Sequence, residues 1–410
     1  MYDPTFGSAA LAKHLTKSDF LKQPTLKSEA HKEALVAQAV ATARNGFSSL
    51  PLTPNNLAGR TIYQVNDLAS ELVLRKAAQN IRRITASKQG SRVEIVRRLK
   101  LLCEEGLPFT VAKMDIKNFY PSVDQDFLSG QLSKRLMTAP STRYVVRSLI
   151  EQCKVNSVSG LPPGLAISAE LSEFYLQDFD QRMREKQNAH YFARYVDDIV
   201  LVLPELDNPN SLKMQIEEAL PAGLKLNFSK SKIYTFKNIN MKTPTVEQSF
   251  DYLGFKFSVF HIDKDKPPSR RVELDIAPSK VRKNKTRIVK SLLQYLSDGN
   301  FDDLRDRVRI LTCAYQFFDE KQQKKRSAGL QHTYSLINSN APALAELDRF
   351  FSGMVLCRSG AIGGRLALVM TNRQRKELLK YSFVNGIANR VHFRFSADRL
   401  ADLMECWKYA

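Results

Sequence analysis

The sequence predicts an α+β protein with an antiparallel sheet at its centre and a mostly helical C-terminal part. Two observations predict the sheet. Residues 109–114 form an apolar-rich run, and residues 190–203 hold two runs of β-branched and aromatic residues on either side of an aspartate pair. Residues 126–187 and the chain beyond residue 277 have helical periodicity instead. Helix-rich and strand-rich blocks that follow one another along a chain are typical of α+β proteins.

The aspartate pair is Asp197-Asp198, and the runs around it predict a β-hairpin with both carboxylates at its tip. Adjacent carboxylates repel each other, and removing them from water is costly unless a cation is present. A hard divalent ion that prefers oxygen ligands, Mg²⁺ in the first place, would balance their charge. A solvated surface turn explains the pair equally well when the pair is considered alone.

A third carboxylate, Asp115, lies at the end of the predicted strand that starts at residue 109. An aspartate in this place is usually a helix cap or a turn former. Together with Asp197 and Asp198, however, it completes a set that can hold two Mg²⁺ ions about 4 Å apart. That arrangement catalyses in-line phosphoryl transfer.

The charge of the chain points to a polyanionic partner. The formal net charge is +20 and the pI is about 9.7, which favours nucleic acid or an acidic membrane surface. No run of 18 apolar residues and no secretory signal is present, so we expect no membrane partner. The five cysteines are scattered without a Cys-x-x-Cys motif, so the sequence supports neither a zinc site nor a disulfide framework and favours a reducing, cytoplasmic location.

Basic residues are concentrated in two segments, residues 75–100 and residues 280–290. The first holds nine Lys or Arg residues against one acid, Glu94, and the second is interleaved with apolar residues at helical spacing. Both patterns indicate contact with phosphates, although a solvated helical face is the alternative. The expected nucleic-acid-binding residues are Arg82, Arg83, Lys280, Arg282, Lys283, Lys285 and Arg287.

Five motifs in order make the chain resemble reverse transcriptases over about residues 60–260. The motifs are Phe109 to Tyr120, Leu161-Pro162-Pro163-Gly164, Tyr195-Val196-Asp197-Asp198, Lys230 in Asn-Phe-Ser-Lys, and Tyr252-Leu253-Gly254-Phe255. Their order and spacing are those of the family. The resemblance implies a right-hand polymerase with fingers, palm and thumb.

The domain boundaries that we expect from this resemblance divide the chain into five parts. They are an N-terminal helical extension (1–60), basic fingers (61–108), a palm (109–260) with a fingers insertion (126–187), a linker (261–276), and a helical thumb with a C-terminal extension (277–410).

The resemblance also implies roles for single residues. Asp115, Asp197 and Asp198, with the backbone carbonyl of Ile116, would bind two Mg²⁺ ions, for which Mn²⁺ is a possible substitute. Tyr120 would exclude the ribose 2′-hydroxyl, so that deoxynucleotides are preferred. The remaining expected nucleotide contacts are Lys88, Arg92, Pro163, Gly164 and Lys230, and the expected primer grip is Tyr252, Leu253 and Gly254.

The second motif departs from the family pattern at one position. Pro163 stands where most relatives have glutamine before the glycine. The segment 161–176 looks most like bacterial unassigned and abortive-infection reverse transcriptases, which are similar to retron and group II intron enzymes and often serve antiphage defence. We see no maturase, endonuclease or ribonuclease H segment, which favours a defence enzyme over a mobile element.

Three functions remain open on the sequence. The first is templated synthesis on RNA, such as a dedicated noncoding RNA, with dNTPs as substrates and DNA as product. The second is template-independent or protein-primed DNA synthesis, which Pro163 makes worth testing. The third is a nucleic-acid-binding module with a vestigial polymerase site, which the three aspartates argue against. Tyr120 argues against an RNA-dependent RNA polymerase. Each of the three functions is compatible with a partner defence protein or with a homo-oligomer.

Overall fold

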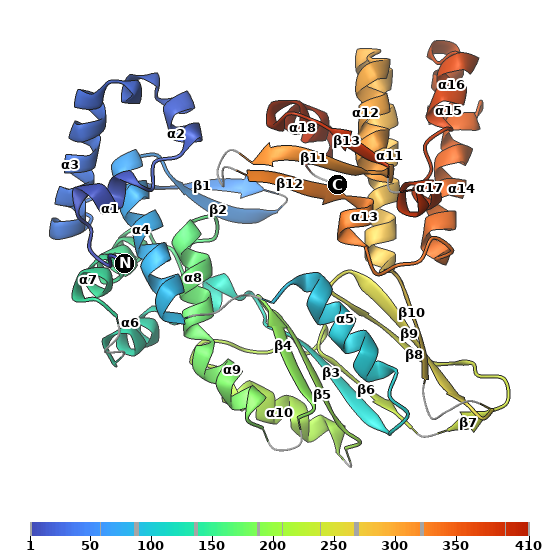
Figure 1. The fold of residues 1–410 in the computed structure, drawn as a ribbon, viewed down its shortest axis with the longest axis horizontal. Helices are drawn as coiled ribbons and strands as arrows, with labels where there is room; N and C mark the ends of the chain where they lie inside the picture. The colour runs from blue at the N-terminus through green and yellow to red at the C-terminus, as the bar shows by residue number, and fades with distance from the viewer. Residues whose placement is uncertain are drawn as a thin grey trace. The chain divides into compact units, whose positions relative to one another are not determined.

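The computed structural model describes residues 2–408 except 58, 86–89, 135–137, 187–188, 207, 238, 266–269, 320–323 and 390. The chain divides into two compact units, residues 1–90 with 108–237 and residues 91–107 with 238–410. Each unit contains helices and antiparallel strands, so the predicted α+β class is confirmed (Figure 1). In the described part of the chain, no helix combines the length and the apolar character needed to cross a membrane.

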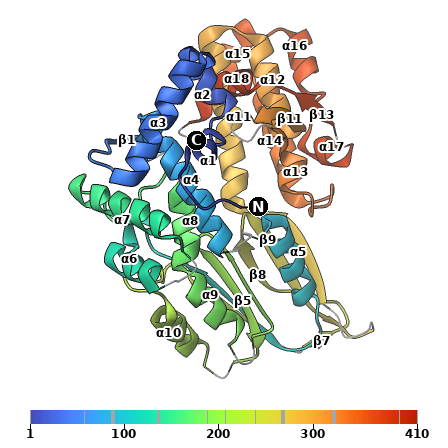
Figure 2. The same cartoon turned by 60° about the vertical axis from the view of Figure 1, so that its left-hand side comes forward.

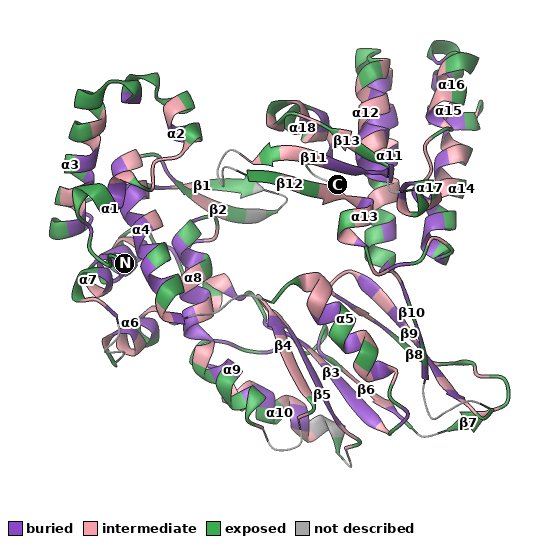
Figure 3. Ribbon diagram, in the orientation of Figure 1, coloured by how far each residue is buried: buried purple, intermediate pink, exposed green. Residues whose placement is uncertain are grey.

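The first unit contains a four-stranded antiparallel sheet in the order β4-β5-β3-β6. Its strands are β3 (Phe109–Asp115), β4 (Tyr191–Tyr195), β5 (Asp198–Pro204) and β6 (Lys232–Phe236). The two central strands, β3 and β5, are buried along nearly their whole length (Figure 3). Alternate residues of these strands share one apolar core with α9 (Gln177–Arg184) and α10 (Pro209–Ala219), which cover that face of the sheet (Figure 2).

The other elements of this unit are mainly helical. They are α1 (Ser8–Ala12), α2 (Lys17–Lys22), η1 (Pro24–Lys27), α3 (Glu29–Asn45), the hairpin of β1 (Leu52–Leu57) and β2 (Arg60–Val65), α4 (Leu68–Thr85), η2 (Tyr120–Ser122), α6 (Gln125–Lys134), α7 (Pro140–Val155) and α8 (Ala166–Tyr175). Helix α8 begins directly after the Pro162-Pro163-Gly164 loop, and Ser168 in its first turn donates a hydrogen bond from Oγ to the Pro162 carbonyl at 2.7 Å.

The second unit contains a sheet in which β9 (Phe255–Asp263) pairs with β8 (Val246–Tyr252), with β10 (Arg270–Ile276) and with the short β7 (Asn240–Met241). The linker predicted over residues 261–276 is therefore wrong in its described part. Residues 270–276 alternate between buried and more exposed positions, and this period of two suits a strand on the edge of a buried sheet.

Beyond this sheet the second unit is helical with one addition that the sequence did not predict. The helices are α11 (Pro278–Asp298), α12 (Phe301–Thr312), α13 (Leu330–Thr333), α14 (Pro342–Leu356), α15 (Gly360–Val369), α16 (Asn372–Leu378), α17 (Phe383–Ala388), α18 (Ala397–Met404) and η3 (Glu405–Trp407). The addition is a three-stranded sheet of β11 (Ala314–Asp319), β12 (Lys324–Gly329) and β13 (His392–Arg394), in the order β12-β11-β13.

Helix α5 (Arg92–Cys103) belongs to the second unit, whereas we predicted one basic segment over residues 61–108. Its buried residues Ile95, Val96 and Leu99 face β9 and β10. The Arg270 amide also donates a hydrogen bond to the Glu104 carbonyl at 2.8 Å, just after the helix. Burial of this apolar face, rather than the charge that the segment shares with α4, decides where α5 packs.

Candidate active site

The predicted hairpin around the aspartate pair is formed by β4 and β5, with a two-residue turn of Val196 and Asp197. Asp198 is already the first residue of β5 and pairs with Tyr195. The turn has an unusual backbone, because Val196 has a φ of 60°. A β-branched side chain is strained in this left-handed region, which glycine occupies readily.

The structure brings the third carboxylate to the same place. Asp115 ends β3 and lies directly opposite Asp198 on the neighbouring strand β5. The backbone continues this link, because the Ile116 amide donates a hydrogen bond to the Asp197 carbonyl at 3.2 Å. Asp115 is 5 % exposed, and its carbonyl accepts a hydrogen bond from the Asn227 amide at 2.7 Å. The predicted set of three aspartates therefore gathers at one end of the two central strands.

The charges of these carboxylates oppose one another. Burial and the charges of Asp197 and Asp115 raise the pKa of Asp198, the charges of Lys113 and Lys230 lower it, and the net result is a pKa of about 6. Lys230 Nζ lies 3.2 Å from Asp115 Oδ1. This oxygen is buried and accepts no hydrogen bond from any described residue, because the lysine approaches it outside hydrogen-bond geometry. The crowded negative charge is incompletely neutralised by the protein itself.

Tyr120, the predicted sugar gate, is half-buried near these aspartates. Burial raises the pKa of its hydroxyl, a hydrogen bond with Ser172 lowers it, and the charges of Glu173 and Asp197 raise it. The backbone of Tyr120 is also fixed, because its carbonyl accepts a hydrogen bond from the Leu161 amide at 2.9 Å. Tyr120 therefore lies within electrostatic reach of Asp197, and its role as a sugar gate stays a prediction.

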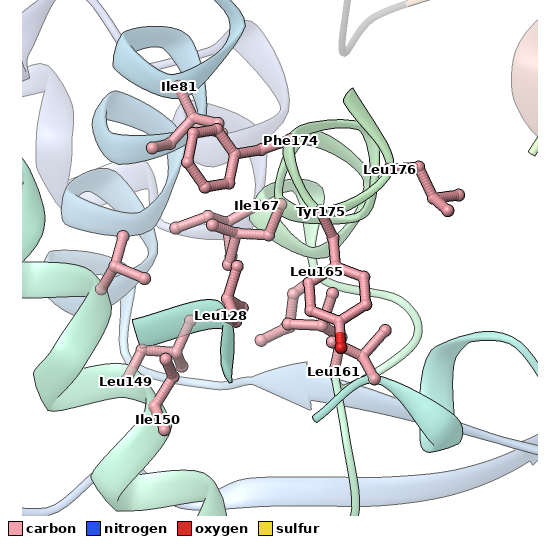
Figure 4. Close-up of a cluster of buried hydrophobic side chains, with 14 of the residues drawn as sticks. Ile81, Leu128, Leu149, Ile150, Leu161, Leu165, Ile167, Phe174, Tyr175 and Leu176 are labelled. Carbon is pink, nitrogen blue, oxygen red and sulfur yellow. The ribbon is translucent and has the colours of Figure 1, made fainter. Parts of the chain in front are cut away.

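The Pro162-Pro163-Gly164 loop is anchored at both ends by buried leucines, Leu161 and Leu165, which lie in one apolar cluster (Figure 4). Gly164 has a φ of 104°, and a Cβ added to it would lie 2.6 Å from the Tyr63 carbonyl oxygen. The Pro163 carbonyl accepts a hydrogen bond from the Tyr63 amide at 2.6 Å. We expected Gly164 to contact the nucleotide, but its close neighbour in the structure is strand β2 of the chain itself.

Residues 65–257 match the family model described as reverse transcriptase (RNA-dependent DNA polymerase). These residues are a reverse transcriptase domain. The chain is accordingly a nucleotidyltransferase, and such a domain implies an RNA template, dNTPs as substrates and a DNA product. No curated protein matches the chain.

Reverse transcriptases use divalent metal ions, and the chemistry of the aspartates suits such an ion. A divalent cation would neutralise the repulsion at Asp198 and occupy the Asp115 oxygen that accepts no hydrogen bond. Within the described residues, however, no three acidic, imidazole or thiol side chains lie close enough to form a ready-made ligand shell. Binding would therefore require the aspartate side chains to converge and Lys230 to move away from Asp115.

The raised pKa of Asp198 predicts how the stability of the metal-free protein depends on pH. The folded state holds the Asp198 proton up to about pH 6, whereas the unfolded chain releases it near its ordinary pKa of 3.8. The free energy of unfolding therefore falls as the pH rises from about 4 to about 6. Asp198→Asn should raise the free energy of unfolding by roughly 2 kcal/mol at pH 7.5 and leave it unchanged near pH 4. The measurement is thermal unfolding in the presence of a chelator. Equal effects at both pH values would contradict this assignment.

Most described basic residues of the segment 75–100 contact acidic side chains of the chain itself, which the local count of one acid did not reveal. Arg75 binds Asp19 and Glu71, Arg82 binds Glu170, Arg97 and Arg98 bind Glu94, and Lys100 binds Glu104. Arg83 is exposed and lies 5.3 Å from the centre of the Tyr2 ring. Lys88 lies outside the described residues. Much of the positive charge in this segment is therefore neutralised within the fold.

The predicted primer grip forms the hairpin turn between β8 and β9. Tyr252 ends β8, Phe255 begins β9, and Leu253 and Gly254 between them have φ values of 46° and 79°. Two left-handed residues in succession are typical of a two-residue hairpin turn. Arg92 Nε donates a hydrogen bond to the Leu253 carbonyl at 2.7 Å, and the guanidinium lies over the rings of Phe255 and Tyr334. Arg92 therefore holds this turn.

The basic residues of segment 280–290 lie on α11. Some of their side chains are exposed, and others contact residues of the same unit. Lys280, Arg282 and Lys283 are exposed, so their predicted contact with nucleic acid stays a prediction. Lys285 Nζ lies 2.6 Å from Glu346, and the Arg287 guanidinium lies 5.5 Å from the centre of the Trp407 ring. Burial lowers the pKa of Arg287, while Tyr315 and Tyr334 raise it.

Sequence reasoning missed a buried cluster next to the aspartate turn. Arg194 on β4 forms ion pairs with Glu173 on α8 and Asp180 on α9. Burial lowers the pKa of Arg194, but the hydrogen bonds and charges of Asp180 and Glu173 outweigh this and raise it. The available signal was the position of Arg194, a cation inside a strand that is otherwise apolar and aromatic.

Proposed function

We propose that the reverse transcriptase domain extends a 3′-hydroxyl by two-metal catalysis, with Asp115, Asp197 and Asp198 as ligands of two Mg²⁺ ions. The observation that supports this most strongly is the register of the central strands. Asp115 and Asp198 occupy opposite positions on β3 and β5, and Asp197 lies in the adjoining turn. When bound, the ions would lower the pKa of the attacking hydroxyl and stabilise the charge that develops at the α-phosphate.

The other residues of the site would then have distinct tasks. Lys230, released from Asp115, would neutralise the departing pyrophosphate, since its side chain is 66 % exposed. Tyr120 would exclude a ribose 2′-hydroxyl. Lys88 would contact the triphosphate, and the Ile116 carbonyl would complete the coordination of one ion. Arg92 is better explained as a support of the primer-grip turn, because its Nε already donates to the Leu253 carbonyl.

The proposed architecture is that of a right hand. The sheet β4-β5-β3-β6 would be the central part of the palm, and the helices over residues 126–187 would be the fingers insertion. The helical second unit beyond residue 277 would be the thumb with an extension. The exposed cations Lys280, Arg282 and Lys283 on its first helix support this assignment, because they suit contact with a phosphate backbone.

A second candidate function is template-independent or protein-primed DNA synthesis. The observation that favours it is Pro163, whose backbone is bound to Tyr63 and whose ring offers no polar group to a template or an incoming nucleotide. Loss of the glutamine amide that most relatives have there removes one contact on which templated selection would depend.

One experiment separates the two candidates. The protein is purified with the nucleic acid that it retains and given Mg²⁺ with labelled dNTPs, singly and together, with and without ribonuclease. Incorporation that ribonuclease abolishes would establish a copied RNA, and sequencing the product would identify it. Incorporation that survives ribonuclease, with label attached to protein, would establish protein-primed synthesis. Equal signal from an Asp197→Ala variant, or none from either protein, would contradict both.

We further propose a role in antiphage defence, supported by the likeness of residues 161–176 to abortive-infection reverse transcriptases. Cells that express the chain should form fewer phage plaques than cells that express Asp197→Ala at the same level. Equal plaque counts over a broad phage panel would contradict the defence role and leave the polymerase assignment untouched.

A further inference from the structure

We propose that Arg194 is a positioning residue for the aspartate turn: it holds the strained Val196 backbone in the conformation that presents Asp197 and Asp198. The inference rests on the proposed metal-binding role of these aspartates. Arg194 is not expected to touch substrate or metal, because its side chain is 3 % exposed and fully engaged by the protein.

The turn needs such a support because of its sequence. Val196 has a φ of 60°, where the branched Cβ crowds its own backbone, and glycine is the usual residue in tight hairpin turns of this kind. A strained backbone persists only when its surroundings hold it, and such residues gather at functional sites. Without a support, this turn would relax and change the position of the carboxylates that follow it.

Arg194 provides the support through a complete set of hydrogen bonds. Nη1 donates to the Val196 carbonyl at 3.0 Å and to Glu173 Oε1 at 3.1 Å. Nη2 donates to Glu173 Oε2 and to Asp180 Oδ2, both at 2.7 Å, and Nε donates to Asp180 Oδ1 at 2.8 Å. All five N–H groups of the guanidinium are used, so its plane and orientation are fixed.

The carboxylates of Glu173 and Asp180 orient the guanidinium so that it donates to the Val196 carbonyl. Glu173 and Asp180 come from consecutive helices, α8 and α9, which also contribute to the core beneath the sheet. A lysine at position 194 would keep one positive charge for these carboxylates but has a single ammonium in place of the planar fork. It could not bind both acids side-on and the Val196 carbonyl together.

The main test is Arg194→Lys, with Mg²⁺ binding measured by the rise in thermal unfolding temperature during a Mg²⁺ titration. We expect the half-saturating Mg²⁺ concentration to increase about tenfold, because the ligands lose part of their preorganisation. Val196→Gly in the same chain should reverse most of this increase, since glycine adopts the turn without strain. Val196→Gly alone should stay within twofold of the wild type.

A matched control is Arg75→Lys. Arg75 also binds two carboxylates, Asp19 and Glu71, and a backbone carbonyl, that of His14 at 3.0 Å, but lies on α4. It should lower the unfolding temperature without changing the half-saturating Mg²⁺ concentration. If Arg194→Lys behaves like this control, or if Val196→Gly does not reverse its Mg²⁺ defect, the positioning role is wrong.

A second variant covers the case in which Arg194→Lys does not fold. Asp180→Asn leaves Glu173 as a charged partner for Arg194, so no buried charge is left unpaired, but it weakens the side-on grip on Nε and Nη2. It should increase the half-saturating Mg²⁺ concentration several-fold, again with reversal by Val196→Gly, and an unchanged value would overturn the proposal.

The Mg²⁺ titration needs no dNTP incorporation, so it separates the proposed polymerase function from the positioning role of Arg194. A wild-type protein that binds Mg²⁺ without polymerising would overturn the proposed function alone. A wild-type protein that Mg²⁺ does not stabilise would overturn the positioning role.

Discussion

Asp115→Asn is expected to reduce dNTP incorporation by about 10³-fold or more. Asparagine has nearly the shape of aspartate, so the buried position at the end of β3 should remain well packed. The variant lacks the negative charge that would hold a cation opposite Asp198, and loss of charge stabilisation at a phosphoryl-transfer centre costs on the order of 4 kcal/mol of activation free energy. The measurement is single-turnover extension of a primed RNA template.

The control for this variant is Asp126→Asn, an aspartate on α6 whose side chain is 84 % exposed and pairs with Lys154. It should retain wild-type activity, because exposed ion pairs contribute little to stability. Mg²⁺ should also stabilise Asp126→Asn against heat but not Asp115→Asn. Retention of more than a tenth of the activity by Asp115→Asn would exclude this carboxylate as a metal ligand.

Tyr120→Ala is expected to reduce the discrimination between dNTPs and rNTPs about 100-fold, with less than a tenfold loss of dNTP incorporation. The physical reason is steric, because an aromatic ring beside the sugar leaves no room for a 2′-hydroxyl, whereas alanine does. The neighbouring Phe119, whose ring centre lies 5.4 Å from that of Tyr120, stays in place in this variant. The measurement is the ratio of kcat/KM for a dNTP to that for the matching rNTP.

Tyr120→Phe separates the ring from its hydroxyl. It keeps the aromatic surface and removes the hydrogen bond with Ser172, so it should discriminate against rNTPs as well as the wild type does. If the alanine variant still rejected rNTPs, the sugar gate would have to lie elsewhere. If the phenylalanine variant lost discrimination, the hydroxyl rather than the ring would be responsible.

The pairing of Lys230 with Asp115 has a consequence for how the site binds a cation. In the structure the lysine supplies part of the positive charge that a divalent ion would provide. The ammonium and the ion would compete for the same carboxylate oxygen, because two cations cannot share it closely without repulsion. This exchange would connect binding of the ion with release of Lys230 toward the phosphates.

The sequence by itself determined those features that depend on local pattern. Apolar and β-branched runs predicted β3 and the β4–β5 hairpin, and the order of the motifs predicted the reverse transcriptase domain that the family model matches. The gathering of Asp115 with Asp197 and Asp198 could also be anticipated, because each follows or begins a strand with a recognisable pattern.

Only the tertiary structure decided which side chains pair with the charged residues. Asp19, Glu170 and Glu173, which pair with Arg75, Arg82 and Arg194, lie on other elements of the fold, so a count within a sequence window could not reveal them. The same holds for α5, which packs by its buried face and not by its charge. Hydrogen bonds and ion pairs between distant segments depend on how the elements pack, and this information is spread over the whole chain.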